Sequence, residues 1–263
     1  MMEGVISHRV NAERLALLGW SRAIVLQMAH PLVAAGVAYH SHFRATPMAA
    51  VQRLRETVRA MLALTFGDSI THGHAISGIR AIHTRVNGRL RESTGVYPAG
   101  TPYSAEDPAL LLWVHATLIE SVLLTYEQFV GPLTAGDRDA YCAEAAPVAA
   151  ALGAREPDLP RTSAALDDYL TRELASGRIC VGADARAIVE AVLFPPLVAI
   201  SGPAAWLNRV VTLGMLPPIV REQYGFAWTT RRERQFHRAA VLIRAARRFT
   251  PRRLALWREA RTR

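Results

Sequence analysis

Hydrophobic positions recur along most of the chain with the period of an α-helix. Between residues 47 and 66, apolar side chains repeat every three or four positions and arginines lie between them, as in an amphipathic helix. Other segments show the same pattern or a helix-forming composition, and glycine, proline or capping residues bound them. The predicted helices cover residues 13–28, 32–40, 47–66, 79–86, 108–130, 134–152, 161–176, 185–193 and 231–249.

The fold class follows from what accompanies these helices. No convincing run of alternating β-branched residues, internal repeat or low-complexity linker interrupts them, and residues 91–108 are expected to form a loop. The 263 residues are 51% hydrophobic, enough to build one large core. We therefore predict an all-α fold with one large domain of roughly ten helices at residues 1–230. Residues 231–263 are expected to form a basic helical appendage that packs on it.

Charge is distributed unevenly. All 31 basic residues are arginine, so a Schiff-base lysine and a P-loop lysine are excluded. Residues 231–263 hold 12 arginines and two glutamates, a net charge of +10, which leaves 19 − 20 = −1 for residues 1–230. Because the body is neutral, we do not expect a nucleic-acid partner.

Membrane spans and export are not expected. The charged N-terminus does not resemble a secretory signal, and prolines or polar residues interrupt the apolar segments 24–38 and 191–208. Cys142 and Cys180 cannot form a disulfide framework. We predict a cytoplasmic protein whose broken apolar segments are buried, with peripheral contact to the inner membrane face left open.

Two interpretations remain for the basic appendage. Apolar residues recur through residues 236–249 at helical spacing, and arginines surround them. This stripe could pack on the body, which we favour, or the helix could bind an anionic membrane surface.

Histidines are the candidates for chemistry. Taken singly, each is more often a hydrogen-bonded core residue than a ligand. The pair His72 and His74 is expected in a surface glycine loop, and no zinc-protease motif is present. His83 stands one helical turn after Arg80, an arrangement suited to a haem pocket, where imidazole binds iron and guanidinium binds a propionate. The histidines in apolar surroundings are His30, His40, His42, His83 and His115.

Several motifs in order resemble one family. They are LQMAHPLVAAGVA at residues 26–38, Arg80-x-x-His83, WVHATL at 113–118, YEQFVGPL at 126–133, LPP at 216–218, Tyr224-Gly225 and Trp228. From about residue 10 to 249, the chain is similar to the helical catalytic domain of bacterial rubber oxygenase (latex clearing protein) and the fungal oxygenase of mycophenolic acid biosynthesis. That resemblance implies noncovalent haem b in a pocket between helices and dioxygen-dependent cleavage of an isoprenoid alkene.

The resemblance also implies residue roles. His83 matches the axial, metal-binding histidine, Arg80 a pocket arginine and His115 a second histidine near the cofactor. Arg53 and Thr57 resemble the catalytic arginine and threonine on the oxygen side. Where many relatives carry an acidic residue after the GVA run, this chain has Tyr39, so a carboxylate base is not expected there.

The sequence thus predicts a haem b-dependent oxygenase that acts on a small apolar alkene, isoprenoid or lipid-like, with dioxygen. The alternative is a nonenzymatic haem- or lipid-binding protein at the membrane surface. A third possibility, a structural membrane-surface protein, needs no cofactor.

Overall fold

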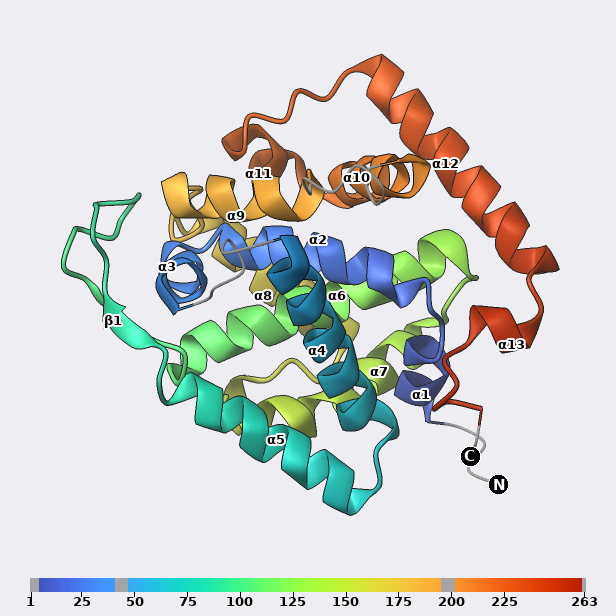
Figure 1. Ribbon diagram of the computed structural model, residues 1–263, viewed down its shortest axis with the longest axis horizontal. Helices are drawn as coiled ribbons and strands as arrows, with labels where there is room; N and C mark the ends of the chain where they lie inside the picture. The colour runs from blue at the N-terminus through green and yellow to red at the C-terminus, as the bar shows by residue number, and fades with distance from the viewer. Residues whose placement is uncertain (1–4, 41–46, 195–201, 262–263) are drawn as a thin grey trace.

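The computed structural model describes residues 5–40, 47–194 and 202–261, and this part of the chain is almost entirely helical (Figure 1). It contains thirteen α-helices, one 3₁₀ turn and a single two-stranded sheet. The all-α prediction is confirmed. The helices are α1 (Ile6–Asn11), α2 (Ala16–Met28), α3 (Pro31–His40), α4 (Pro47–Phe66), α5 (Ser69–His83), α6 (Pro108–Phe129), α7 (Ala135–Leu152), α8 (Ser163–Ala175), α9 (Ala183–Leu193), α10 (Pro203–Met215), α11 (Pro218–Gln223), α12 (Thr230–Phe249) and α13 (Arg252–Ala255).

The crossing of α2 and α6 forms the centre of the fold. Gly19 lets the two helices approach closely, because a Cβ atom there would lie 2.6 Å from Thr125 Oγ1 and 2.7 Å from the Ser121 carbonyl oxygen. Helices α9, α10 and α11 cover one side of this pair, and α1, α7 and α8 lie against α6 on the other. Both main core clusters therefore share α6.

A buried arginine joins three of these helices. Arg22 on α2 is only 3% exposed. Its Nε donates to the Met215 carbonyl of α10 at 2.7 Å, and its Nη1 donates to Ser121 Oγ at 2.6 Å. Both terminal nitrogens also contact the Glu120 carboxylate on α6. A buried charge needs such partners, so this network fixes α2, α6 and α10 relative to one another.

The break between α2 and α3 is held by a buried histidine. Pro31 begins α3 at 105° to α2, and His30 lies at the corner with 5% of its surface exposed. The Leu32 backbone N–H donates to His30 Nδ1 at 3.3 Å, which leaves the proton on Nε2, 3.2 Å from the Tyr97 hydroxyl oxygen. Burial lowers the pKa of His30 to about 4, so the ring is neutral.

Helix α5 is longer than the sequence predicted. It begins at Ser69, because the Asp68 carboxylate caps it by accepting from the Thr71 backbone N–H at 2.8 Å. The expected surface loop with His72 and His74 is therefore wrong. None of the residues of α5 is fully buried, and Ile82 is 49% exposed.

A small hairpin follows α5. Strand β1 (Asn87–Arg89) pairs antiparallel with β2 (Pro102–Ser104), so the segment expected to be a loop contains one strand. Leu90 and Tyr103 of this hairpin pack on Leu32 and Ala35 of α3.

The other departures lie near proline and glycine. Helix α9 starts at Ala183 after Gly182, two residues before the predicted start at residue 185. Pro195 and Pro196, which were expected to break the apolar segment, lie outside the described residues. On either side of them Phe194 and Trp206 are 46% and 42% exposed, so this segment is less buried than predicted. The sequence did not predict α1, α10, α11 or α13 as separate helices.

The C-terminal residues pack on the body and reach back to the N-terminus. Phe236 and Ile243 of α12 lie in a core cluster with Phe129 and Met215. The Arg247 guanidinium contacts both carboxylate oxygens of buried Glu13, at 2.8 and 2.5 Å. Backbone hydrogen bonds from Trp257 to the Ala12 carbonyl and from Arg14 to the Ala255 carbonyl continue this contact.

By length and composition, α6 could cross a bilayer, as could the bent pair α2 and α3 if counted as one span. In the structure most of α6 is enclosed by other helices, as in the core helix of a globular domain.

The close approach at Gly19 gives a stability prediction. Gly19→Ala should lower the free energy of unfolding by about 1–3 kcal/mol, because the new methyl group meets α6 backbone that cannot move away. The matched control is Gly73→Ala on α5, where a Cβ meets no described atom within 4 Å. It should raise stability by about 0.5–1 kcal/mol. Urea unfolding measures both, and equal effects would contradict this account of the crossing.

His30 gives a pH prediction. The unfolded chain binds the proton below about pH 6.5, whereas the folded ring binds it only near pH 4, so stability is full above pH 6.5 and falls between these values. The fall of the pKa from 6.5 to about 4 corresponds to at most about 3.4 kcal/mol. His30→Asn keeps an acceptor for the Leu32 N–H and should flatten the fall. Thermal unfolding from pH 7 to 4 measures this loss of stability, with the exposed residue change His74→Asn as the control. If stability still falls equally in His30→Asn, His30 is not the cause.

Candidate functional site

His115 lies on the central helix, two turns after its start. The Asp107 carboxylate caps α6 by accepting from the Ala109 backbone N–H at 2.8 Å, and Pro108 occupies the first turn. The surrounding apolar helix places His115 against the core. Burial lowers its pKa to about 4, and its Nε2 is buried without a hydrogen-bond partner among the described residues. The imidazole is therefore neutral and carries an unsatisfied nitrogen.

His83 is the last residue of α5, at the end of the helix that leads into the hairpin. Its Nδ1 is also buried and has no partner in the described part of the chain. Burial lowers the pKa of His83, and the nearby charge of Glu106 opposes this effect only in part. Because Glu106 directly precedes α6, His83 lies near the start of the helix that carries His115 (Figure 1).

These two imidazoles share an uncommon state. Within the described ranges, they hold the only histidine nitrogens that are buried without a partner. An unsatisfied buried polar atom costs about 1–3 kcal/mol, so each such atom calls for an explanation, such as a bound water or a ligand. A neutral imidazole nitrogen can bind a metal or accept or donate one hydrogen bond. The donor set therefore fits a haem group, whose iron and propionates offer such contacts.

The Arg80 guanidinium makes a hydrogen bond to α7. It is exposed, and its Nη1 donates to the Ala151 carbonyl near the end of α7 at 3.3 Å. The structure thus places Arg80 one turn before His83 but directs its guanidinium to α7.

Arg53 and Thr57 both lie on α4, which crosses in front of the body between α2 and α5 (Figure 1). Four residues apart, they share one face of that helix. Thr57 is exposed, whereas the side chain of Arg53 lies outside the described residues. The structure therefore relates them to the two histidines only through the place of α4 in the fold.

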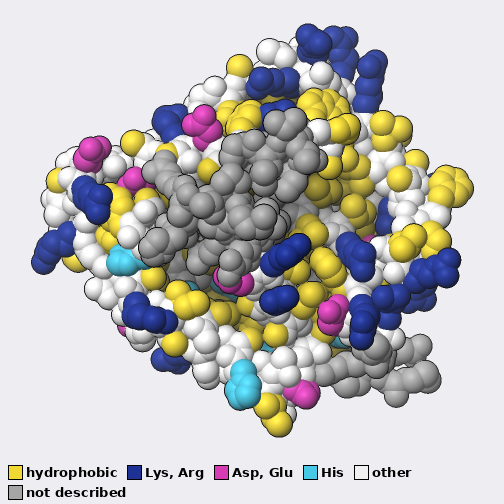
Figure 2. Space-filling model, in the orientation of Figure 1, with side chains coloured by type: hydrophobic (Ala, Val, Ile, Leu, Met, Phe, Trp, Pro, Cys, Tyr) yellow, Lys and Arg dark blue, Asp and Glu magenta, His cyan; other side chains and the backbone are white. Residues whose placement is uncertain are grey.

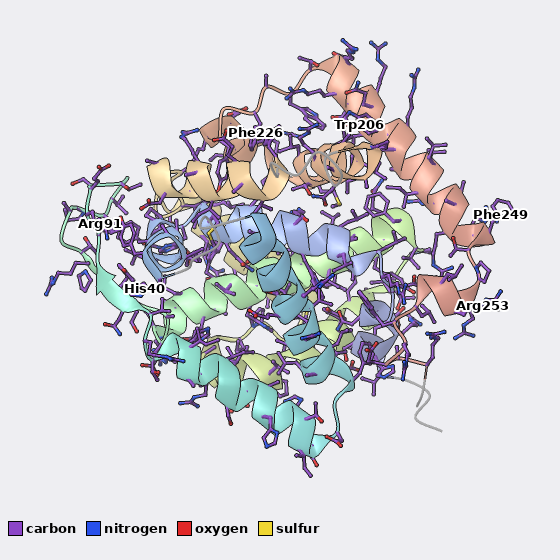
Figure 3. The ribbon with its side chains drawn as sticks, in the orientation of Figure 1. His40, Arg91, Trp206, Phe226, Phe249 and Arg253 are labelled. Atoms are coloured by element: carbon purple, nitrogen blue, oxygen red, sulfur yellow. The ribbon has the colours of Figure 1, made fainter. Side chains whose placement is uncertain are left out.

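Tyr39 and His40 lie at the end of α3, beneath the hairpin. The Arg91 guanidinium stacks on the Tyr39 ring at 4.1 Å, and His40 Nε2 lies 3.0 Å from the Tyr103 hydroxyl (Figure 3). Burial and a hydrogen bond with Asp184 raise the pKa of Tyr39, which keeps its phenol protonated. Tyr39 can therefore donate a hydrogen bond but cannot replace a carboxylate base.

Some polar groups that join the elements of the fold were not found from the sequence. Arg22, Tyr97 and Arg91 gave no motif, although an arginine within the apolar run 15–28 could have indicated a buried ion pair with Glu120. No group of three or more His, Cys, Asp or Glu side chains that could hold a metal ion occurs within the described residues. His42, one of the earlier candidates, lies outside them.

Sequence comparisons find relatives over most of the chain. An uncharacterized protein of Mycobacterium tuberculosis and one of Mycobacterium bovis are each 28% identical over 205 residues, which cover 77% of this chain and 76% of each relative. A search of the solved structures finds no significant match. Residues 8–245 match the family described as the catalytic domain of ER-bound oxygenase mpaB/B' and rubber oxygenase. This match covers both unpartnered histidines and most of the described helices, and the chain therefore belongs to the mpaB and rubber oxygenase catalytic-domain family.

Proposed function

We propose that the protein is a haem b-dependent oxygenase that oxidises or cleaves an apolar alkene, isoprenoid or lipid-like, with dioxygen. The observation that carries this proposal is the pair of buried, neutral and unpartnered imidazole nitrogens of His83 and His115. The family's oxygenase character is consistent with it.

The apolar surface of α4 and α5 also supports haem. From residue 55 to 83, Phe66 is the only fully buried side chain, although Val58, Met61, Leu62 and Ile79 are apolar. These side chains stay half-buried and retain surface that a flat apolar macrocycle can cover. A group of this kind would also exclude water from the two imidazoles.

Each residue has a distinct task in this proposal. Haem, when bound, supplies the iron at which dioxygen is activated. His83 would hold the iron, because its lowered pKa keeps the ring nitrogen free of a proton at neutral pH. His115 would satisfy its unpartnered nitrogen by a hydrogen bond to the cofactor. Arg53 and Thr57 donate hydrogen bonds on the oxygen side, where developing negative charge is stabilised.

Arg80 can serve the pocket only by exchanging its present contact. Its hydrogen bond to the Ala151 carbonyl is long and exposed, so it is weak and a charged propionate can replace it. Otherwise Arg80 acts on the site indirectly, by fixing α5 against α7.

The alternative function is a nonenzymatic haem or lipid carrier. Tyr39 favours it, because a stacked, protonated phenol stands where the family resemblance implies an acid. The two functions differ in turnover. An oxygenase consumes dioxygen when given an alkene lipid, whereas a carrier shows low-spin haem with both axial positions closed and consumes none.

His83→Ala should abolish haem binding and leave the helical fold intact, because the axial bond contributes most of the affinity. His115→Ala and Arg80→Ala should weaken haem retention by about 10- to 100-fold without abolishing it. The Soret absorbance after reconstitution measures occupancy, and circular dichroism reports the fold. His74→Ala, exposed on the same helix, is the control. Full occupancy in His83→Ala would transfer the ligand role to His115.

Thr57→Ala and Arg53→Ala should keep full haem content and depress turnover, because hydrogen bonds that stabilise developing charge act on the reaction rather than on cofactor binding. Oxygen uptake with an alkene lipid measures turnover. It should fall by about tenfold or more for each lost donor. Arg59→Gln, on the same helix, is the control. Unchanged oxygen uptake in both variants would exclude them from the oxygen side.

A further inference from the structure

Helix α12 presents two different faces. Its inner face, formed by Phe236, Ala239, Ala240 and Ile243, packs against α6 and α10. The sequence allowed the apolar stripe either to pack on the body or to bind a membrane. In the structure it largely packs on the body. Any interaction with a partner must involve the other side of the helix.

The opposite side carries a second apolar group. We call this side the outer face of α12; at 100° per residue its members lie within about 120° of the helix circumference. Val241 and Leu242 are 68% and 69% exposed, and Phe249 is 86% exposed. These values are far above those of the inner face. The outer face consists of Arg234, Arg238, Val241, Leu242, Ala245, Arg248 and Phe249.

The next helix extends this surface. On α13, Leu254 is 59% exposed, and Arg252 and Arg253 are also exposed. Figure 2 shows hydrophobic and basic side chains together along the rim of the molecule where these helices lie. Phe249 projects away from the body at the end of α12, and Arg253 lies beside it on α13 (Figure 3). Apolar and basic groups therefore form one continuous ridge.

The arginines of the outer face are available for a partner. Arg244 and Arg247, which lie elsewhere on α12, are used within the protein, by carbonyls of α6 and by Glu13. In contrast, none of the arginines of the outer face or of α13 forms an ion pair with an acid in the described part of the chain. Their charge is directed to solvent.

We propose that the outer face of α12, together with α13, docks on an anionic lipid bilayer. The arginines contact lipid phosphates, and Val241, Leu242 and Phe249 enter the boundary between headgroups and acyl chains. Exposed apolar side chains surrounded by basic residues on a helix are the pattern that binds such an interface. Docking would leave the core intact, because it uses none of the inner face.

The shape and charge of the ridge favour a bilayer over other partners. The helix lies at the edge of the molecule, where a flat, deformable surface can reach it (Figure 1). If this face bound a second copy of the chain, the same arginines would meet across the contact, and their like charges would repel each other. Nucleic-acid binding commonly adds aromatic stacking platforms, and Phe249 is the only aromatic residue on this face.

The experiment uses the full-length protein, because deletion of residues 231–263 would uncover Phe129 and Met215 and leave Glu13 without Arg247. Cosedimentation with vesicles of phosphatidylcholine and phosphatidylglycerol should show binding that weakens steeply as salt is raised. Binding to vesicles of phosphatidylcholine alone should be much weaker.

Two sets of substitutions separate the contribution of the arginine charges from that of the apolar side chains. Arg234→Gln, Arg238→Gln and Arg248→Gln together should lower the partition coefficient about 10- to 100-fold at low salt and reduce its salt dependence. Val241→Ser, Leu242→Ser and Phe249→Ser together should lower it about tenfold or more at every salt concentration. Both sets lie on an exposed face, so thermal unfolding should be unchanged.

The matched control removes the same charge on the side formed by α7 and α8, with Arg155→Gln, Arg161→Gln and Arg172→Gln, and should bind as the unchanged protein does. The proposal is overturned if this control loses as much binding as the first set or if the two vesicle types bind equally. It is also overturned if sedimentation shows that the apolar set instead abolishes a dimer, or if duplex DNA binds more tightly than anionic vesicles. None of these measurements depends on haem or turnover.

Discussion

The fold depends on one close helix crossing that encloses a charged side chain. Gly19 brings α2 against Ser121 and Thr125 of α6, and one turn later Arg22 reaches Glu120, Ser121 and the Met215 carbonyl. The close approach excludes water, and the arginine must then find all its partners within the protein. Because these partners lie on α6 and α10, a change at this point would displace the helices that carry both the core and His115.

The candidate site lies at the margin of this rigid centre. His115 belongs to the central helix, whereas His83 ends α5, whose residues are mostly exposed. One histidine is thus fixed by the core and the other by a helix with fewer buried contacts. A cofactor held between them would connect α5 to α6 directly and so stabilise the less buried part of the structure.

Sequence periodicity predicted the long helices well, because their apolar stripes and caps act within one segment. The bounds of α4 were predicted without error, and Thr134 caps α7 with a reciprocal contact to Asp137. It failed for α5, where two glycines suggested a loop although the Asp68 cap starts a helix. The candidate histidines followed from their apolar surroundings and the spacing of Arg80 and His83, and a family resemblance added their roles. The missing partners of His83 and His115 depend on tertiary packing that no local pattern contains.

The contact of the C-terminal segment with the N-terminus has a consequence for synthesis. Glu13 is translated 234 residues before its partner Arg247, and the neighbouring Trp257 follows later still. The cluster around Phe129 and Met215 likewise waits for Phe236 and Ile243. The first contact spans more than 200 residues of chain, so it cannot form while Arg247 is still in the ribosome. The nascent chain therefore exposes apolar surface and a lone carboxylate until the segment that carries Phe236 and Arg247 has emerged.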